Sequence, residues 1–315
     1  MKTISDATIT CLNGWWDLKP EFSIIPLQER IPSDGWHENG ILVPSVWTKS
    51  HHGVRKKGEK YYYADTDIAN WSDEHEFLFD TYNYQLEWTK TRHGWLRRTL
   101  NIPEKRKGRR YFLRFLAVLP QCAVFLNGTE VARHREAMLP LEVDATDALK
   151  EGDNELVVLI MDYERDARGR CFFPSGNSFT ECHSGIWQDV FLVERSNVYV
   201  SDMTIVTSVR RQLLHVSVTV ANAGDAFQET MVTCAARHFR ADVMPQAGDV
   251  AHELGSLRVG VPARGEATIE FETEWEDAEY WSQFNPKLYQ LETRLAWQGE
   301  LFEHYYERFG FREVW

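Results

Sequence analysis

Apolar and polar residues alternate along much of this chain, and this alternation constrains the fold more than any other feature. In QLLHVSVTV (212–220) and EATIEFE (266–272), apolar residues recur at every second position, with polar residues between them. Successive side chains of a β-strand point to opposite faces, so this period predicts strands with one packed and one solvated face. Helix-length amphipathic segments are nearly absent, and DATDALKEG (144–152) suits at most a short helical turn. The chain is therefore predicted to be all-β and mainly antiparallel.

Turn motifs separate the predicted strands. Asn127 and Gly128 divide two apolar-rich runs in CAVFLNGTEVARH, and both tolerate the positive φ that a two-residue type I′ hairpin needs. NGT also fits a glycosylation sequon, but the tight turn explains it better. Strands and turns at this spacing predict β-sandwiches. With 315 residues, we predict two domains, over 1–195 and 196–307.

Charge and cysteine content argue against several classes of function. The net charge is −12 and no long basic run occurs, which disfavours a nucleic-acid partner. No apolar run approaches the roughly 20 residues needed to cross a membrane, and the N-terminus lacks the apolar region of a signal peptide. The five cysteines are scattered and form no C-x-x-C pair. We therefore expect a cytoplasmic protein with reduced thiols and no membrane partner.

Eight motifs follow one another across nearly the whole chain. They are LNGWWDLKP (12–20), VPSVWTK (43–49), GWLRRTLNIPE (94–104), RRYFLRFLAVLPQCAVFLNGTEVARH (109–134), LPLEVDATDALKEGDNELVVLI (139–160), SGIWQDVFLVE (184–194), YWSQFNPKLYQLETRL (280–295) and RFGFREVW (308–315). In this order they resemble the non-catalytic N-terminal part of glycoside hydrolase family 2, which includes β-galactosidases, β-glucuronidases and β-mannosidases. Each motif is weak alone, and their order makes the resemblance specific.

The resemblance implies a jelly-roll, galactose-binding-like domain followed by an immunoglobulin-like sandwich, with carbohydrate as the partner. Family members continue into a (β/α)₈ barrel that carries two catalytic glutamates at its strand ends. Residues 308–315 are then expected to begin the connection to that barrel. Without it, this chain is expected to hold no catalytic residue and no cofactor, and to be inactive alone. Phe309 and Phe311 are expected to lack packing partners. An exposed apolar patch near these two residues, Phe284 and Leu288 would favour this reading.

The segment from Arg168 to Trp187 is the strongest functional candidate, because it is long and does not alternate. In several family members a loop at this position walls the sugar pocket. The resemblance therefore implies substrate contacts by Asn177, Glu181 and His183. The alternative is that these residues cap strands or satisfy loop backbone groups. No metal site is predicted, since His51-His52 has no third ligand nearby.

The twelve tryptophans raise a second possibility, because an exposed indole can stack on a sugar ring. Trp15, Trp47, Trp95 and Trp187 lie in the framework motifs, so core or domain packing is favoured for them. The aromatic and acidic segment 61–90 stays unassigned.

Three readings of the whole chain remain open. The favoured one is an accessory part of a retaining family 2 glycosidase, which supports the barrel and shapes the sugar pocket. The second is a stand-alone carbohydrate-binding module. The third is a structural pair of domains that forms a homo-oligomer.

Overall fold

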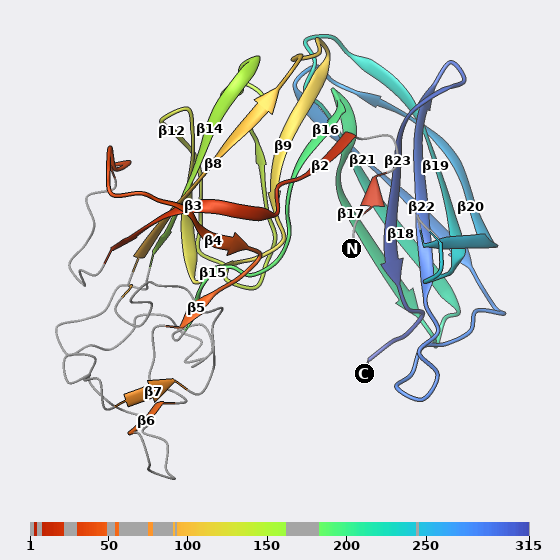
Figure 1. Cartoon of the computed structure of the whole chain (residues 1–315). Helices are drawn as coiled ribbons and strands as arrows, with labels where there is room; N and C mark the ends of the chain where they lie inside the picture. The colour runs from red at the N-terminus through yellow and green to blue at the C-terminus, as the bar shows by residue number, and fades with distance from the viewer. Residues whose placement is uncertain are drawn as a thin grey trace. The chain divides into compact units, whose positions relative to one another are not determined.

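The computed structural model describes residues 3–4, 8–21, 30–48, 54–56, 75–77, 91, 93–161, 183–243 and 246–314. Within these ranges the chain forms strands β1 to β23 and no helix, as the alternation predicted (Figure 1). It folds as two compact units. The N-terminal unit comprises 9–105 and 111–193, and the C-terminal unit comprises 1–8, 106–110 and 194–315. None of the described segments forms a helix able to cross a membrane.

The N-terminal unit contains a six-stranded and a four-stranded sheet. The first has the order β12 (Thr129–His134), β11 (Gln121–Leu126), β14 (Gly152–Met161), β8 (His93–Ile102), β3 (Gly14–Glu21) and β4 (His37–Val43). The second has the order β13 (Leu141–Asp144), β9 (Arg109–Phe115), β16 (Val190–Ser196) and β2 (Thr8–Cys11). Two further sheets are small. One has the order β10 (Val118–Leu119), β15 (His183–Ile186) and β5 (Trp47–Thr48), and the other pairs β6 (Val54–Lys56) with β7 (His75–Phe77).

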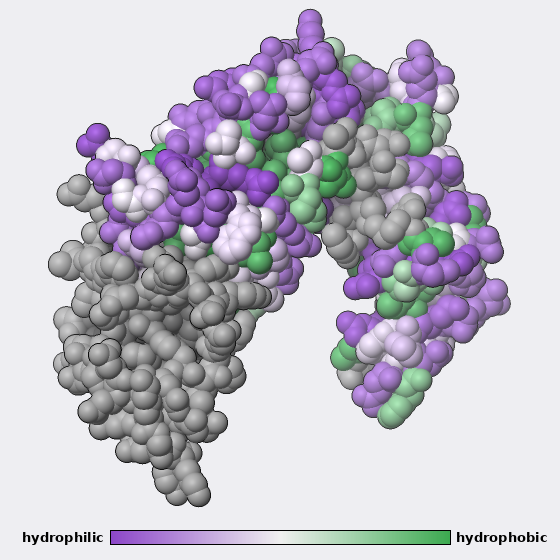
Figure 2. Space-filling view, in the orientation of Figure 1, coloured by the Kyte–Doolittle hydropathy of each residue, from purple (hydrophilic) through white to green (hydrophobic). Residues whose placement is uncertain are grey.

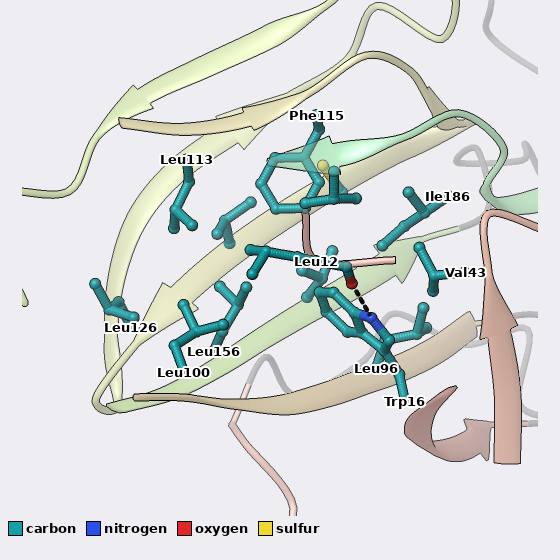
Figure 3. Packing of buried hydrophobic residues seen from close by; sticks show 14 of the residues in the cluster. Leu12, Trp16, Val43, Leu96, Leu100, Leu113, Phe115, Leu126, Leu156 and Ile186 are labelled. Atoms are coloured by element: carbon teal, nitrogen blue, oxygen red, sulfur yellow. Dashed lines mark hydrogen bonds between the residues drawn. The ribbon is translucent and has the colours of Figure 1, made fainter. Parts of the chain in front are cut away.

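One hydrophobic core joins the two large sheets of this unit (Figure 3). Leu96 and Trp16 come from the six-stranded sheet, and Leu113 and Phe115 come from the four-stranded sheet. Burying a side chain of this size contributes about 1.5–3 kcal/mol. The indole Nε1 of Trp16 donates a hydrogen bond to the carbonyl of Leu12 at 2.9 Å, so its one polar atom is satisfied inside the core.

The LNG motif anchors the start of this unit to β16. The Asn13 amide Nδ2 donates to Asp189 at 2.8 Å, and the Val190 backbone N–H donates to Asn13 Oδ1 at 3.0 Å. The Leu12 N–H donates to the Val190 carbonyl at 2.8 Å. Gly14 follows with a φ of 116°, a conformation that favours glycine. Two motifs that lie far apart in the sequence are thus parts of one junction.

The predicted Asn127-Gly128 hairpin is confirmed. Asn127 and Gly128 have φ values of 51° and 84°, as a type I′ turn requires. The Asn127 amide Nδ2 also donates to Asn154 Oδ1 at 2.8 Å and to the Ala148 carbonyl at 2.9 Å. The side chain therefore ties the hairpin to the turn that precedes β14, which supports the structural explanation of the NGT sequence.

The C-terminal unit is an immunoglobulin-like sandwich. Its three-stranded sheet has the order β17 (Val198–Ser208), β18 (Leu213–Asn222) and β21 (Gly265–Glu274). Its five-stranded sheet has the order β1 (Thr3–Ile4), β23 (Glu300–Phe309), β22 (Tyr289–Trp297), β19 (Gln228–Phe239) and β20 (Ala247–Val261). Of β17 to β23, the first, second and fifth strands share one sheet and the remaining four share the other, which is an immunoglobulin-like arrangement.

The alternation predicted in this unit is confirmed strand by strand. In β18, Val216 and Val218 are fully buried, whereas Ser217 between them is partly exposed. In β21, Phe271 is buried and its neighbour Glu270 is exposed. The bounds of the domains, and the jelly-roll connectivity of the first one, stay predictions.

Phe309 and Phe311 pack within the C-terminal unit, so the expectation that they lack packing partners is wrong. Phe311 is fully buried and meets Trp275 edge-on, with 5.6 Å between ring centroids. Phe309 packs on Tyr289 at 5.7 Å. Pairing of β23 with β22 and a bridge between Phe311 and Tyr280 bring these rings together.

The apolar patch that would favour the accessory reading is correspondingly absent from the described surface. Of its four residues, only Phe284 is largely exposed, at 90%. Leu288 is partly buried, and Phe309 and Phe311 belong to the interior. Figure 2 shows hydrophilic residues over most of the visible described surface, with hydrophobic ones in small groups.

Candidate functional site

Two strands of the N-terminal unit, β14 before the candidate segment and β15 within it, show where the segment is attached to the fold. β14 ends at Met161, shortly before Arg168, and β15 begins at His183, inside the segment. β14 and β15 contact each other. His183 pairs with Thr48, the last residue of β5, and Gly94 near the start of β8 pairs with Ile160 near the end of β14. We call this region, which comprises the end of β5, the start of β8, the end of β14 and the start of β15, the strand-end edge.

A tryptophan and a glycine determine the packing at the strand-end edge. Trp47 is 1% exposed, and its Nε1 donates to the Thr91 carbonyl at 3.1 Å. A Cβ atom at Gly94 would lie 2.6 Å from Cη2 of Trp47, so only glycine permits this approach. The VPSVWTK and GWLRRTLNIPE motifs therefore meet at one contact, which explains why a tryptophan and a glycine stand there.

Of the three predicted substrate contacts, the structure describes His183 alone. His183 is half-buried on β15. Asn177 and Glu181 lie outside the described residues. The role of all three in sugar binding therefore stays a prediction.

Two buried polar atoms close to the strand-end edge have no hydrogen-bond partner among the residues that the structure describes. They are Oγ of Ser184 and Nε1 of Trp95, and both residues are fully buried. Ser184 pairs with Trp47 across the small sheet. Leaving a buried polar group unpaired costs about 1–3 kcal/mol. Sequence reasoning missed both atoms, because hydrogen bonding at a buried position depends on residues far away in the chain.

The tryptophans divide between the core and the surface. Trp47 and Trp95 are buried, as predicted, and Trp187 is partly buried, with its Nε1 donating to the Ala137 carbonyl. Core packing is wrong for Trp15, which is 51% exposed, whereas its neighbour Trp16 is 1% exposed. A signal was available, because Trp16 shares its strand face with Leu18, and Trp15 shares the opposite face with polar residues.

Trp15 lies on a face with fixed polar groups. Asp17, two residues along β3, accepts hydrogen bonds from Arg97 Nη2 at 2.9 Å and Nε at 3.2 Å. The guanidinium of Arg97 lies 4.3 Å from the ring centroid of Trp36 and 3.8 Å from a carboxylate oxygen of Glu155. Planar rings beside such hydrogen-bonding groups suit the apolar face and the hydroxyl groups of a sugar.

The described residues contain no group of three or more His, Cys, Asp and Glu side chains that converge to hold a metal ion. Burial raises the pKa of the Cys122 thiol to about 12, and burial raises that of Cys234 to about 12 as well. The thiolate is the reactive and metal-binding form, so these two cysteines are packing residues at neutral pH.

Family models match both parts of the chain. Residues 9–196 match the model described as "Glycosyl hydrolases family 2, sugar binding domain". Residues 198–312 match the model described as "Glycosyl hydrolases family 2". The chain belongs to glycoside hydrolase family 2. This confirms the resemblance carried by the eight motifs.

Known β-galactosidases and a solved β-glucuronidase match between 61% and 97% of the chain. A β-galactosidase of Actinobacillus pleuropneumoniae is 26% identical over 309 residues, which are 97% of this chain and 25% of the relative. A β-galactosidase of Enterobacter cloacae is 30% identical over 203 residues, 61% of this chain and 18% of the relative. The structure of a β-glucuronidase of Bacteroides uniformis matches with a TM-score of 0.68 at 18% identity, covering 97% of this chain and 32% of that one. This structural likeness shows the fold. The chain thus spans about a quarter or less of the length of these two β-galactosidases.

Proposed function

We propose that this chain is the N-terminal accessory part of a retaining family 2 glycoside hydrolase, which hydrolyses O-glycosidic bonds. One observation carries the proposal: 97% of this chain aligns with 25% of a β-galactosidase. In this role the two units support a catalytic barrel, and the strand-end edge helps to shape the sugar pocket. Carbohydrate is the proposed partner, and the cytoplasm the proposed location, in keeping with free thiols at Cys11, Cys122 and Cys234.

The chemistry is assigned to the barrel and not to this chain. A retaining glycosidase uses one carboxylic acid and one carboxylate about 5–5.5 Å apart. Two buried carboxylates of the C-terminal unit are paired with cations, and a third, Glu303, accepts a hydrogen bond from the Val200 backbone N–H at 3.2 Å. Glu194 accepts hydrogen bonds from Arg106 at 2.5 Å and Arg109 at 3.0 Å, and Glu292 accepts one from Arg237 at 2.7 Å. We therefore propose no catalytic glutamate in the described residues.

Hydrolysis assays on the purified chain test this assignment. The 315-residue chain would be incubated with a panel of nitrophenyl glycosides, with heat-denatured protein as the control. We expect no release of nitrophenol above that control. Turnover that purifies with the chain and saturates with substrate would place catalytic carboxylates within it and would contradict the accessory role.

The exposure of Trp15 favours a second candidate, a carbohydrate-binding module. In this role a sugar ring stacks on Trp15, and Asp17 and Arg97 bind its hydroxyl groups. Calorimetric titration with neutral mono- and oligosaccharides separates this role from the first. The module predicts saturable binding that Trp15→Ala abolishes and that Phe284→Ala, which removes an exposed ring of the C-terminal unit, leaves intact. If none of these sugars binds to the wild-type chain, the carbohydrate-binding module is eliminated.

A homo-oligomer is the third candidate. Light scattering on the eluting peak of a size-exclusion column measures its mass, and a monomer over the accessible concentration range eliminates it.

A further inference from the structure

Two parts of the C-terminal unit hold the residues that follow β23. The first part is the loop before β22, where the Trp281 N–H donates to the Phe311 carbonyl at 2.9 Å. The guanidinium carbon of Arg312 lies 4.9 Å from the ring centroid of Trp281, within the range of a cation–π contact. A Cβ atom at Gly310 would lie 3.0 Å from Cβ of Trp281, so the glycine permits the segment to run close to this loop.

The second part is the end of β17, which binds the backbone of the same segment. The Thr207 hydroxyl donates to the Arg312 carbonyl at 2.5 Å and accepts from the Arg312 N–H at 3.2 Å. A hydroxyl can act as donor and acceptor at once, so one side chain satisfies both polar backbone groups of Arg312. The segment is thereby fixed as a strand partner would fix it.

Glu313 adds four hydrogen bonds to the turn between β17 and β18. Its carboxylate accepts from Ser208 Oγ at 3.1 Å, from the Arg210 backbone N–H at 3.0 Å and from Arg210 Nε at 3.0 Å. Arg210 Nη2 donates to it as well. Hydrogen bonds to a carboxylate are roughly twice as strong as those between neutral groups. The Glu313 side chain is accordingly only 15% exposed.

The β17–β18 turn is itself fixed to the rest of the unit. The Trp275 N–H donates to the Gln212 carbonyl at 2.6 Å, and Gln212 Nε2 donates to the Glu276 carbonyl at 3.3 Å. Trp275 also meets the ring of Phe311 edge-on. The turn, the residues after β21 and the residues after β23 therefore form one closed set of contacts, which a movement of any one of them would break.

We call Thr207, Ser208, Arg210 and Trp281 the segment clamp, because together they hold residues 310–313. We propose that the segment clamp fixes the direction of the chain toward the catalytic barrel and so positions that barrel. A connection held in this way allows the next domain fewer orientations than a flexible linker does. A sugar pocket shaped by this chain and the barrel together depends on that orientation. The inference rests on the proposed accessory role, and the clamp residues are positioning residues that touch no substrate.

Amide hydrogen exchange in the 315-residue chain tests the clamp by itself. The exchange rate of the Arg312 amide would be followed by NMR, with the amides of β18 as the reference for the folded unit. We expect the Arg312 amide to be protected in the wild type. Thr207→Val keeps the shape of the side chain but lacks the hydroxyl, so it should raise this rate about tenfold while β18 stays protected. Glu313→Ala should act in the same direction.

A matched control removes an exposed ion pair elsewhere in the same unit. Arg264 pairs with Asp225 at 2.6 Å, so Arg264→Ala should leave the exchange rate of the Arg312 amide unchanged. The proposal is overturned if this amide exchanges in the wild type as fast as in an unstructured chain. It is also overturned if Thr207→Val and Glu313→Ala have no larger effect than the control.

A chimeric enzyme tests the positioning role. This chain would replace the matching N-terminal residues of the Actinobacillus pleuropneumoniae β-galactosidase, and KM and kcat for a nitrophenyl β-galactoside would be measured with and without Glu313→Ala. We expect KM to rise about tenfold and kcat to change little, because the catalytic carboxylates are assigned to the barrel. An unchanged KM, with the Arg312 amide released in the variant, overturns the positioning role. A wild-type chimera no more active than the enzyme lacking those residues contradicts the accessory role, and with it the positioning role, whereas the exchange rates still decide whether the clamp holds the segment.

Discussion

Glu292 is the clearest case of opposing electrostatic effects at the scale of a single residue. Its side chain is 4% exposed. Burial alone would raise the pKa of this carboxyl, but hydrogen bonds and charge from His304 and Arg237 outweigh burial and lower the pKa to about 2. The folded state therefore holds the proton less tightly than the unfolded chain does, and the ionised carboxylate stabilises the fold.

The first prediction concerns the pH dependence that follows. Because the pKa is depressed, the contribution of Glu292 is complete above its ordinary pKa of 4.5 and is lost as the pH falls toward about 2. Its size at pH 7 is about 3 kcal/mol, from about 1.4 kcal/mol per pKa unit. Urea unfolding of the wild type and of Glu292→Gln, followed at pH 7 and pH 3, measures this. The difference in unfolding free energy between the wild type and Glu292→Gln should be roughly 2 kcal/mol smaller at pH 3 than at pH 7. A gap that is the same at both pH values contradicts this account.

Hairpins and strand pairs show which elements local sequence determines. Period-two alternation predicted β18 and β21, because the two faces of a strand differ in burial along the strand itself. The Asn127-Gly128 turn was also predictable from local sequence, because these two residues themselves favour the positive φ values of the turn. The packing of Phe311 on Trp275 was not predictable, because it depends on how chain segments far apart fold together.

The second prediction concerns the β11–β12 hairpin. Asn127→Ala removes two side-chain donor contacts and places a Cβ-bearing residue at a φ of 51°. We expect a loss of about 1–3 kcal/mol in unfolding free energy. Asn127→Gly loses the same hydrogen bonds but adopts this φ without strain, so it should be about 1 kcal/mol more stable than the alanine variant. Equal stability of the two variants in urea unfolding would show that the turn conformation carries no strain.

At the scale of the whole molecule, family and fold class were predictable and the site was predictable only in part. The ordered motifs identified the family, since each contributes to a contact such as Trp47 on Gly94 or Asn13 on Asp189. The strand-end edge follows from the pairing of β5, β8, β14 and β15, which no local pattern encodes.

The most direct test of the accessory role is a chimera. The matching N-terminal residues of the Actinobacillus pleuropneumoniae β-galactosidase would be replaced by this chain, and kcat/KM for a nitrophenyl β-galactoside measured. The enzyme with those residues deleted serves as the baseline, and His183→Ala in the chimera probes the pocket. We predict that kcat/KM of the chimera is well above that of the deletion enzyme. In the chimera, His183→Ala should raise KM by a larger factor than it lowers kcat. A folded chimera that is no more active than the deletion would contradict the claim that this chain supports a catalytic barrel.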